Sequence, residues 1–377
     1  MFFSTDGPGD LIFLSWIPDS TDCSIDNVVA QGFEKIADCL QSQQAILLHE
    51  RIYGESKSSS TILQERQRIF DEKCIKSNIP PTFVEGTPFS GSGVAGIHAV
   101  ALQGKKQPES TLLEWQGEAC GYVITGNDAR YLTLSDVGRL VRETGGQSPG
   151  DETSKTFEII EQILDKQQWK FNDVRRTWFY LHNILDWYDE FNVVRNDAFK
   201  RMGLFNGKPL SSIPASTGIQ GKNADGGWCT LDLLAMKPID GQTFEAKRLV
   251  NPKQNEASEY GSAFARALSV ETDSCKYIFV SGTAAIDDNG VSVFEGDFER
   301  QTVQTLENVQ ALLEVGGAGL DDISQATSFV KRPQDVEMYY AIASRMGLDK
   351  IPIVCTLADV CRDELLYELD ATAVLSK

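Results

Sequence analysis

The chain of 377 residues carries 54 acidic and 35 basic residues, which gives a formal net charge of −19. This negative charge repels a phosphate backbone, and no run of lysine or arginine is long enough to offset it, so we expect no nucleic-acid partner. An anionic substrate would have to be held by a few local arginines, which favours a small pocket over an open groove. The length predicts two or three domains, and 41% hydrophobic with 24% charged residues is typical of a globular protein.

Targeting segments and cysteine spacing set further limits. No apolar run in the sequence approaches the roughly 20 residues of a membrane span, so no membrane partner is expected. The apolar segment 10–18 is short, lacks preceding basic residues and meets Pro18, so it predicts a strand rather than a signal peptide. The eight cysteines show no metal-ligand spacing. This pattern favours reduced thiols in a cytoplasmic protein over a disulfide framework or a zinc site.

A repeated order of elements divides the chain into three units. Ile-Pro pairs recur at spacings of 134 and 138 residues, at Ile79-Pro80, Ile213-Pro214 and Ile351-Pro352. A period this long indicates repeated domains rather than short solenoid repeats. The expected domains are a divergent N-terminal unit at 1–110, a middle unit at 111–250 and a C-terminal unit at 251–377.

Each unit is expected to follow the order ββαβαββ, with its helices on one face of a mixed sheet. Long helices are predicted at 33–40, 156–166 and 298–314, each followed by a strand, at 45–49, 177–181 and 326–330. Second helices are predicted at 61–73, 188–202 and 336–346, and closing strands at 94–102, 228–236 and 365–374. The sequence thus predicts an α+β chain with approximate threefold symmetry, in which three sheets surround a central core and the helices lie outside.

The last 25 residues contain the most unusual pattern. Residues 353–358 and 365–374 alternate with a period of two, which predicts two strands, and the charged run 362–364 predicts a tight turn between them. Glu368 interrupts an otherwise apolar strand, where a buried unpaired carboxylate would be costly. From this stretch alone, Glu368 is either a solvent-facing residue or a functional acid. Cys361, just before the turn, is either a small apolar residue or a functional thiol.

Several blocks of the third unit carry a family resemblance: residues 277–283, 296–297, Gln301, 305–308, Gly317 and 370–374. Over its whole length this unit resembles the Rid/YjgF family (endoribonuclease L-PSP-like), and the second unit resembles it more distantly. Known members are trimers of one such unit with ligand clefts between subunits. The resemblance therefore implies three tandem Rid/YjgF-like (chorismate-mutase-like) units that form a built-in pseudo-trimer. Many members carry the name endoribonuclease, an activity that the net charge disfavours here.

One feature of that family is missing from this sequence. The Rid imine deaminases hold the substrate carboxylate with an arginine in the strand after the proline. No arginine lies in residues 80–102, 214–221 or 351–360. Imine deamination is therefore disfavoured in all three expected clefts.

Five further blocks, at residues 176–180, 213–219, 260–267, 281–284 and 359–368, are similar in that order to the chorismatases. That family uses a Rid-like C-terminal domain to hydrolyse the enolpyruvyl ether of chorismate, which releases pyruvate. The resemblance spans roughly residues 176–374 and implies that Glu368 is the catalytic acid. It also implies that Cys361 and Gly282 occupy the positions that separate hydroxybenzoate-forming members from those that make a dihydrodiol. Both residues are of the hydroxybenzoate-forming type.

The residue types fit this chemistry. Protonation of the enol ether methylene needs a carboxylic acid that is still protonated near neutral pH, and burial beside Leu366 and Leu369 would raise the pKa of Glu368 accordingly. Chorismate carries two carboxylates, so Arg266 and Arg176 are expected to bind substrate. The predicted turn Ser216-Thr217-Gly218 would add a hydroxyl and backbone donors. Cys361 could act as a nucleophile or as a polarisable wall, and no metal or organic cofactor is needed.

Structural alternatives exist for most of these residues. Arg266 and Arg176 could pair with the plentiful acids, and Arg362 is expected to be a surface turn residue. The three histidines are expected in the core, and the aromatic cluster of residues 178–180 and 187–188 is expected to pack between units. Two functions therefore stand: a chorismatase-like hydrolase acting on a small chorismate-like anion, or a Rid-type small-metabolite-binding protein or imine/enamine hydrolase. The expected assembly is a monomeric pseudo-trimer or a weak homo-oligomer.

Overall fold

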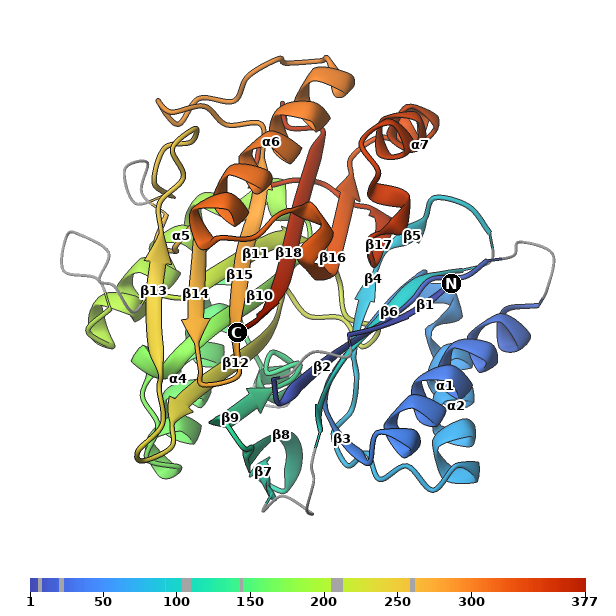
Figure 1. Cartoon of the computed structure of the whole chain (residues 1–377), viewed down its shortest axis with the longest axis vertical. Coiled ribbons are helices and arrows are strands. Elements are labelled where there is room, and N and C mark those ends of the chain that lie inside the picture. The colour runs from blue at the N-terminus through green and yellow to red at the C-terminus, as the bar shows by residue number, and fades with distance from the viewer. Residues whose placement is uncertain are drawn as a thin grey trace.

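The structure, a computed structural model of the chain, describes residues 1–5, 9–19, 24–91, 93–103, 110–142, 145–204, 213–257 and 262–377. Tyr260 and Gly261 of the quoted motifs lie outside these residues. The strands form three sheets, each with helices against its outer face (Figure 1). The predicted α+β class is confirmed. Among the helices described, none combines the length and the apolar character that a membrane crossing requires.

The first sheet has the strand order β1-β2-β6-β3-β4. Helices α1 (Ile25–Ser42) and α2 (Ser59–Glu72) lie on its outer side, and their buried side chains share a core with the sheet. One short strand of this unit, β5 (Thr87–Pro88), leaves it and pairs with the third sheet. The strands of the first sheet are β1 (Phe2–Ser4), β2 (Leu11–Trp16), β3 (Ala45–Gly54), β4 (Thr82–Glu85) and β6 (Val94–Gln103).

The second sheet has the strand order β11-β10-β12-β9-β8-β7. Its helices are α3 (Arg139–Arg142), α4 (Pro149–Lys166) and α5 (Ile184–Arg201). Helix α4 begins where the Ser148 side chain accepts a hydrogen bond from the backbone N–H of Asp151, a typical helix cap. The strands are β7 (Ser110–Trp115), β8 (Glu118–Thr125), β9 (Ala129–Leu134), β10 (Val174–Leu181), β11 (Ala215–Gln220) and β12 (Cys229–Pro238).

The third sheet has the strand order β13-β14-β15-β18-β16-β17-β5. Helix α6 (Phe298–Gly316) starts at the capping side chain of Asp297 and ends at Gly317, whose φ of 85° suits glycine. Its predicted apolar stripe packs on the sheet, and α7 (Val336–Arg345) lies beside it. The strands of this unit are β13 (Glu245–Leu249), β14 (Ala267–Glu271), β15 (Cys275–Ala284), β16 (Ile323–Val330), β17 (Ile353–Leu357) and β18 (Tyr367–Ser376).

Three details differ from the expected topology. The second and third units each open with three strands, one more than the order ββαβαββ contains. Strand β13 belongs to the third sheet, so we propose that the third unit begins near residue 245 rather than at 251. Strands β17 and β18 are not a hairpin, because β16 lies between them and pairs with both. Residues 358–366 are therefore a crossing loop instead of a tight turn.

The inner faces of the three sheets share one hydrophobic core. Buried side chains of every unit meet there, including Phe13, Trp178 and Phe279. Each sheet also packs against its own helices through a separate hydrophobic cluster. This is the predicted arrangement of three sheets around a central core with helices outside.

A shared irregularity aligns the three units residue by residue. In each unit the strand after the long helix skips one residue in its ladder with the closing strand: between Leu47 and His49 in β3, Val174 and Arg176 in β10, and Ile323 and Gln325 in β16. Five residues after the skipped residue of each strand stand Tyr53, Tyr180 and Phe329. Their partners on the closing strands are Gly96, Thr230 and Glu368. Of these three equivalent positions, one alone carries a carboxylic acid.

Candidate active site

A cavity lies where the second unit meets the third. Helix α5 and strand β11 form one side, and β15, β18 and the crossing loop form the other. It contains about 750 Å³ of empty space, counting its open mouth. Of the eight site residues predicted from the sequence, six line it: Ser216, Gly218, Arg266, Gly282, Cys361 and Glu368.

Glu368 lies on β18, opposite Ala284 of β15 and Phe329 of β16. Its side chain is on the inner face of the sheet, because Tyr367 and Leu369 on either side of it point into the helix-covered core. The residue is only 4% exposed. Burial raises the pKa of Glu368 to about 8, with a further increase from the charge of Asp370, while Arg266 and Arg176 oppose the shift. Glu368 is therefore mostly protonated at neutral pH.

Gly282 makes room for this acid. It lies in a bulge of β15, between the paired residues Val280 and Thr283. A Cβ atom at position 282 would stand 2.1 Å from Oε1 of Glu368, closer than any ordinary contact. Glycine is therefore required for Glu368 to keep its position, a physical reason for the residue type at this site.

Three arginines line the cavity and can receive anionic groups. Arg266 and Arg195 are each 1% exposed, and the Arg266 Nε donates to the carbonyl of Asn255. Arg195, on α5, donates to Asn192 and stacks near Phe264. The expectation that Arg362 is a surface residue is wrong, because its guanidinium lines the cavity and donates to Gly290 and Ser292 at 3.1 Å each. The turn at 287–292 holds it there.

Cys361 lies in the cavity wall beside Glu368. Burial raises the pKa of the Cys361 thiol to about 12, and the nearby Glu368 adds to the rise, while Arg362 and a hydrogen bond with Tyr188 oppose it. A thiol with this pKa is neutral at physiological pH, so the geometry disfavours a thiolate nucleophile and favours a polarisable wall. Tyr188, expected to pack between units, also lines the cavity.

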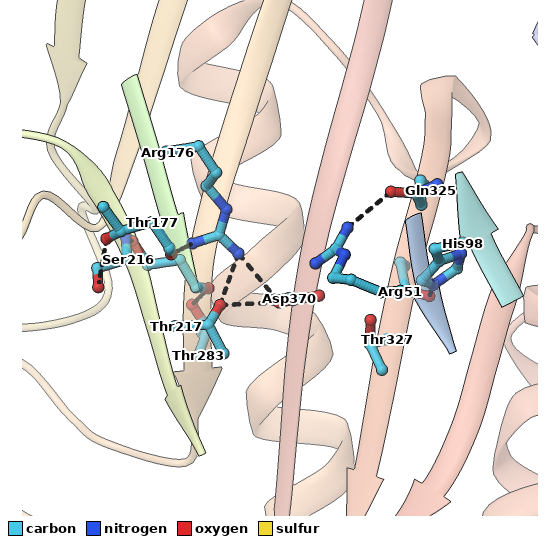
Figure 2. A network of polar contacts seen from close by, with 12 residues as sticks. Arg51, His98, Arg176, Thr177, Ser216, Thr217, Thr283, Gln325, Thr327 and Asp370 are labelled. Atoms are coloured by element: carbon cyan, nitrogen blue, oxygen red, sulfur yellow. Dashed lines mark hydrogen bonds and ion pairs between the residues drawn. The ribbon is translucent and has the colours of Figure 1, made fainter. Parts of the chain in front are cut away.

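Arg176 and Thr217 do not line the cavity. The Arg176 NH2 donates to Asp370 Oδ2 at 3.0 Å, and the Thr217 hydroxyl donates to the same oxygen at 2.8 Å (Figure 2). Burial lowers the pKa of Arg176 to about 10, against the opposing charge of Asp370, so Arg176 stays charged at pH 7. From the first unit, Arg51 approaches Asp370 on the other side of β18 (Figure 2) and donates to Gln325 at 2.9 Å. These residues form a buried support behind Glu368.

The segment Ser216-Thr217-Gly218 is part of strand β11 and not the predicted turn, because residues 215–220 pair in parallel with β10. The Ser216 N–H is already used, since it donates to Ser281 Oγ at 2.8 Å. The Ser216 hydroxyl accepts from Thr177 and is free to donate its own proton toward the cavity. This segment therefore offers the predicted hydroxyl, and the Ser216 N–H is not one of the predicted backbone donors.

The histidines lie elsewhere. His98 bonds to Ser15 and to the Ala326 carbonyl at 2.9 Å each, and His49 contacts Asp232 at 2.9 Å. Both are buried, as expected, whereas His182 is half-buried beside Trp228. Within the described residues, no group of three or more His, Cys, Asp or Glu side chains is arranged to hold a metal ion.

Comparison with known proteins shows a family match for the third unit. Residues 262–375 match the profile of the family described as Endoribonuclease L-PSP. A RutC family protein of Pyrococcus horikoshii is 31% identical over 98 residues, which cover 26% of this chain and 78% of that protein. The chain belongs to the RutC family, within the Rid superfamily. This confirms the superfamily resemblance seen in the third unit.

Two relatives extend the match beyond the RutC-like unit. A protein named 3-hydroxybenzoate synthase, from Streptomyces hygroscopicus, is 27% identical over 241 residues, or 58% of this chain, and the chain spans 66% of that protein's length. A crystal structure of a chorismatase superposes with a TM-score of 0.64 at 18% identity, covering 96% of this chain and 98% of the other. The chorismatase resemblance within the Rid superfamily is confirmed. The shared fold includes the first 170 residues, where the sequence showed no match.

Proposed function

We propose that this chain is a chorismatase-like hydrolase that cleaves the enolpyruvyl ether of chorismate to pyruvate and a hydroxybenzoate. The observation that carries the proposal is a buried acid with a raised pKa, Glu368, in an inter-unit cavity lined by Arg195, Arg266 and Arg362. An acid and several cations are what a dianionic enol ether requires. The 3-hydroxybenzoate synthase of Streptomyces hygroscopicus supports the same class of reaction.

In the proposed reaction, the arginines bind the two carboxylates and place the enolpyruvyl methylene beside Glu368. Glu368 gives its proton to that methylene carbon, and positive charge develops at the ether carbon. Water then adds to this carbon and gives a proton back to the Glu368 carboxylate, and collapse of the adduct, with transfer of its hydroxyl proton to the ether oxygen, releases pyruvate and the ring alcohol. Loss of water from the ring yields a hydroxybenzoate, so the overall conversion consumes no net water. Cys361 and Gly282 lie where they can shape the ring's part of the cavity.

The proposal is tested by incubating the purified chain with chorismate and measuring pyruvate with a coupled dehydrogenase, and the aromatic product by chromatography. We expect pyruvate and hydroxybenzoate in equal amounts. Absence of pyruvate above the level of spontaneous decay would refute the proposal. Hydrolysis of a 2-imino acid by the same preparation, without turnover of chorismate, would favour the imine/enamine hydrolase instead.

Arg266→Ala is expected to weaken chorismate binding by about 2–4 kcal/mol, because a buried, charge-assisted contact to a carboxylate is lost. The measurement is the dissociation constant, obtained by calorimetry in the Glu368→Gln background so that the substrate is not consumed. Arg345→Ala, which removes an exposed arginine on α7, is the matched control and should leave the affinity unchanged. An equal effect of the two substitutions would contradict the assignment of Arg266.

Cys361→Ala is expected to leave pyruvate release within a few fold of the parent while shifting the ring product from hydroxybenzoate toward a dihydrodiol. The neutral thiol does not take part in the protonation step, so its loss changes the ring's environment and not the acid. Product ratios are read by chromatography at full conversion. An unchanged product ratio would contradict the product-controlling role of Cys361. It would not affect the role of Glu368 as the proton donor.

A further inference from the structure

A second cavity lies between the third and first units. It is formed by helix α7, strand β17 and segments of the first unit that include Phe3, Phe89 and Ala95. Its empty space, counting the open mouth, is about 1080 Å³, larger than that of the Glu368 cavity. Both cavities lie between a second helix of one unit and a neighbouring unit.

The shared strand bulge shows that the two cavities are equivalent positions of the pseudo-trimer. In the second unit, Thr177 and Phe179 pair with Ser216 and Gly218, which line the Glu368 cavity. At the same steps after the bulge in the third unit, Ala326 and Ser328 pair with Ile353 and Cys355, which line the second cavity. The counterpart of Glu368 is Gly96, next to the lining residue Ala95.

The lining chemistry of the second cavity is opposite to that of the first. None of its described lining residues is a lysine or an arginine, and its one charged side chain is Asp349. The amino group of Met1, also in the wall, is paired with Asp19. Placing an anion here would cost free energy, because the one cation among the described lining residues, the Met1 amino group, is already paired with Asp19 and little replaces the anion's hydration.

Four aromatic side chains, Phe3, Phe89, Tyr339 and Tyr340, stand among the aliphatic residues of the wall, and the two tyrosine hydroxyls already have partners. Phe89 meets Tyr339 edge to face at 5.3 Å and Tyr340 at 5.9 Å. The Tyr339 hydroxyl forms a hydrogen bond with Ser328 at 2.9 Å and accepts one from the Cys355 thiol at 3.5 Å, and the Tyr340 hydroxyl forms a hydrogen bond with Ser90. The cavity therefore offers a ligand an apolar surface that includes aromatic rings, and such a surface favours another ring.

We propose that this cavity is a binding site for a small uncharged aromatic molecule. It is concave and mostly apolar, as small-molecule sites are. The site is separate from the Glu368 cavity and does not depend on the reaction proposed there. The ligand proposed here is uncharged, whereas the substrate proposed for the first cavity is a dianion.

The test compares indole with indole-3-carboxylate, two probes that share a ring system and differ in charge. Binding to the full chain is measured by saturation-transfer NMR and calorimetry. We expect saturable binding of indole, and affinity for the carboxylate lower by at least about tenfold, because the anion loses hydration without gaining a cation. Equal or tighter binding of the carboxylate would overturn the proposed ligand class, and no saturable binding of indole would overturn the site.

Two substitutions locate the binding. Ala343→Phe fills the cavity from α7, and Ser344→Phe covers it from an exposed position at its mouth, where folding is not at risk. Met338→Phe, on the exposed face of the same helix and outside the lining, is the matched control. Indole binding should be lost in both cavity variants and retained in the control, while pyruvate release from chorismate stays at the parental rate in all three. Indole binding that survives Ser344→Phe in a folded protein would place the probe elsewhere and refute the proposal.

Discussion

Replacing Glu368 by glutamine is expected to lower the rate of pyruvate release by roughly 10²- to 10⁴-fold, the usual contribution of general acid catalysis. Glutamine keeps the shape of the side chain, so the arginines and the cavity should still bind chorismate. The loss should therefore appear in kcat, with little change in KM. Single-turnover measurement of pyruvate separates this chemical step from product release.

The matched control for this substitution is Glu337→Gln, which changes an exposed glutamate on α7. Stability provides a second readout. The pKa of Glu368 is about 8 in the folded chain and 4.5 without the fold's influence. The folded state therefore binds more protons between these values, so the free energy of unfolding falls as pH rises from 4.5 to 8, because Glu368 ionises there in the unfolded chain and not in the folded chain. Glu368→Gln should lack this loss and be at least as stable as the parent at pH 8. Near-parental pyruvate release would contradict the mechanism.

Asp370→Asn is expected to lower the free energy of unfolding by about 3–5 kcal/mol, the usual cost of leaving a buried charge without its partner. Asp370 Oδ2 accepts from both Arg176 and Thr217, and Arg51 lies on its other side (Figure 2). Both guanidinium groups also lie over the ring of Trp178, at 4.7 Å for Arg176 and 4.1 Å for Arg51. The substitution leaves these cations close together without their shared anion. Urea unfolding measures the loss.

Asp363→Asn is the control for this prediction, because Asp363 is exposed and pairs with Lys331 at the surface. It should cost less than about 1 kcal/mol. Asp370→Asn has an additional effect on Glu368: removal of a neighbouring negative charge should lower the pKa of Glu368 and move the alkaline loss of activity to lower pH. A loss of stability no greater than that of Asp363→Asn would show that the contacts of Asp370 with Arg176 and Arg51 contribute little to the free energy of unfolding.

The sequence predicted those features that depend on local pattern. Glu368 was identified because a carboxylate among the neighbouring apolar residues of a strand is unusual. The order of three units followed from the spacing of the Ile-Pro pairs. Alternation also placed β17 and β18 as strands. It could not say which strands are neighbours, because a period of two defines the faces of a strand and not its partner. The insertion of β16 between them is decided by packing of the whole sheet.

The remaining site residues depend on contacts between units. Arg195 and Tyr188 were not predicted to bind a ligand, because an arginine and a tyrosine on an amphipathic helix are ordinary. Helix α5 is kinked at Trp187, with φ −148° and ψ 16°. Because the kink changes the direction of the helix, the sequence pattern alone does not predict which of its faces meets the third unit. Arg176 was expected to bind substrate because it lies in a block similar to the chorismatases and the substrate carries two carboxylates, but its side chain belongs to the support around Asp370.

The pH dependence of kcat for pyruvate release tests most directly the claim that a protonated Glu368 cleaves chorismate. Because the acid form is the active one and the pKa of Glu368 is about 8, the rate should be constant near neutral pH and fall above pH 8, with a slope of one proton. Glu368→Gln should show no such limb in its residual activity. A parental rate that stays flat from about pH 6 to about pH 10 would contradict the role of Glu368 as the proton donor.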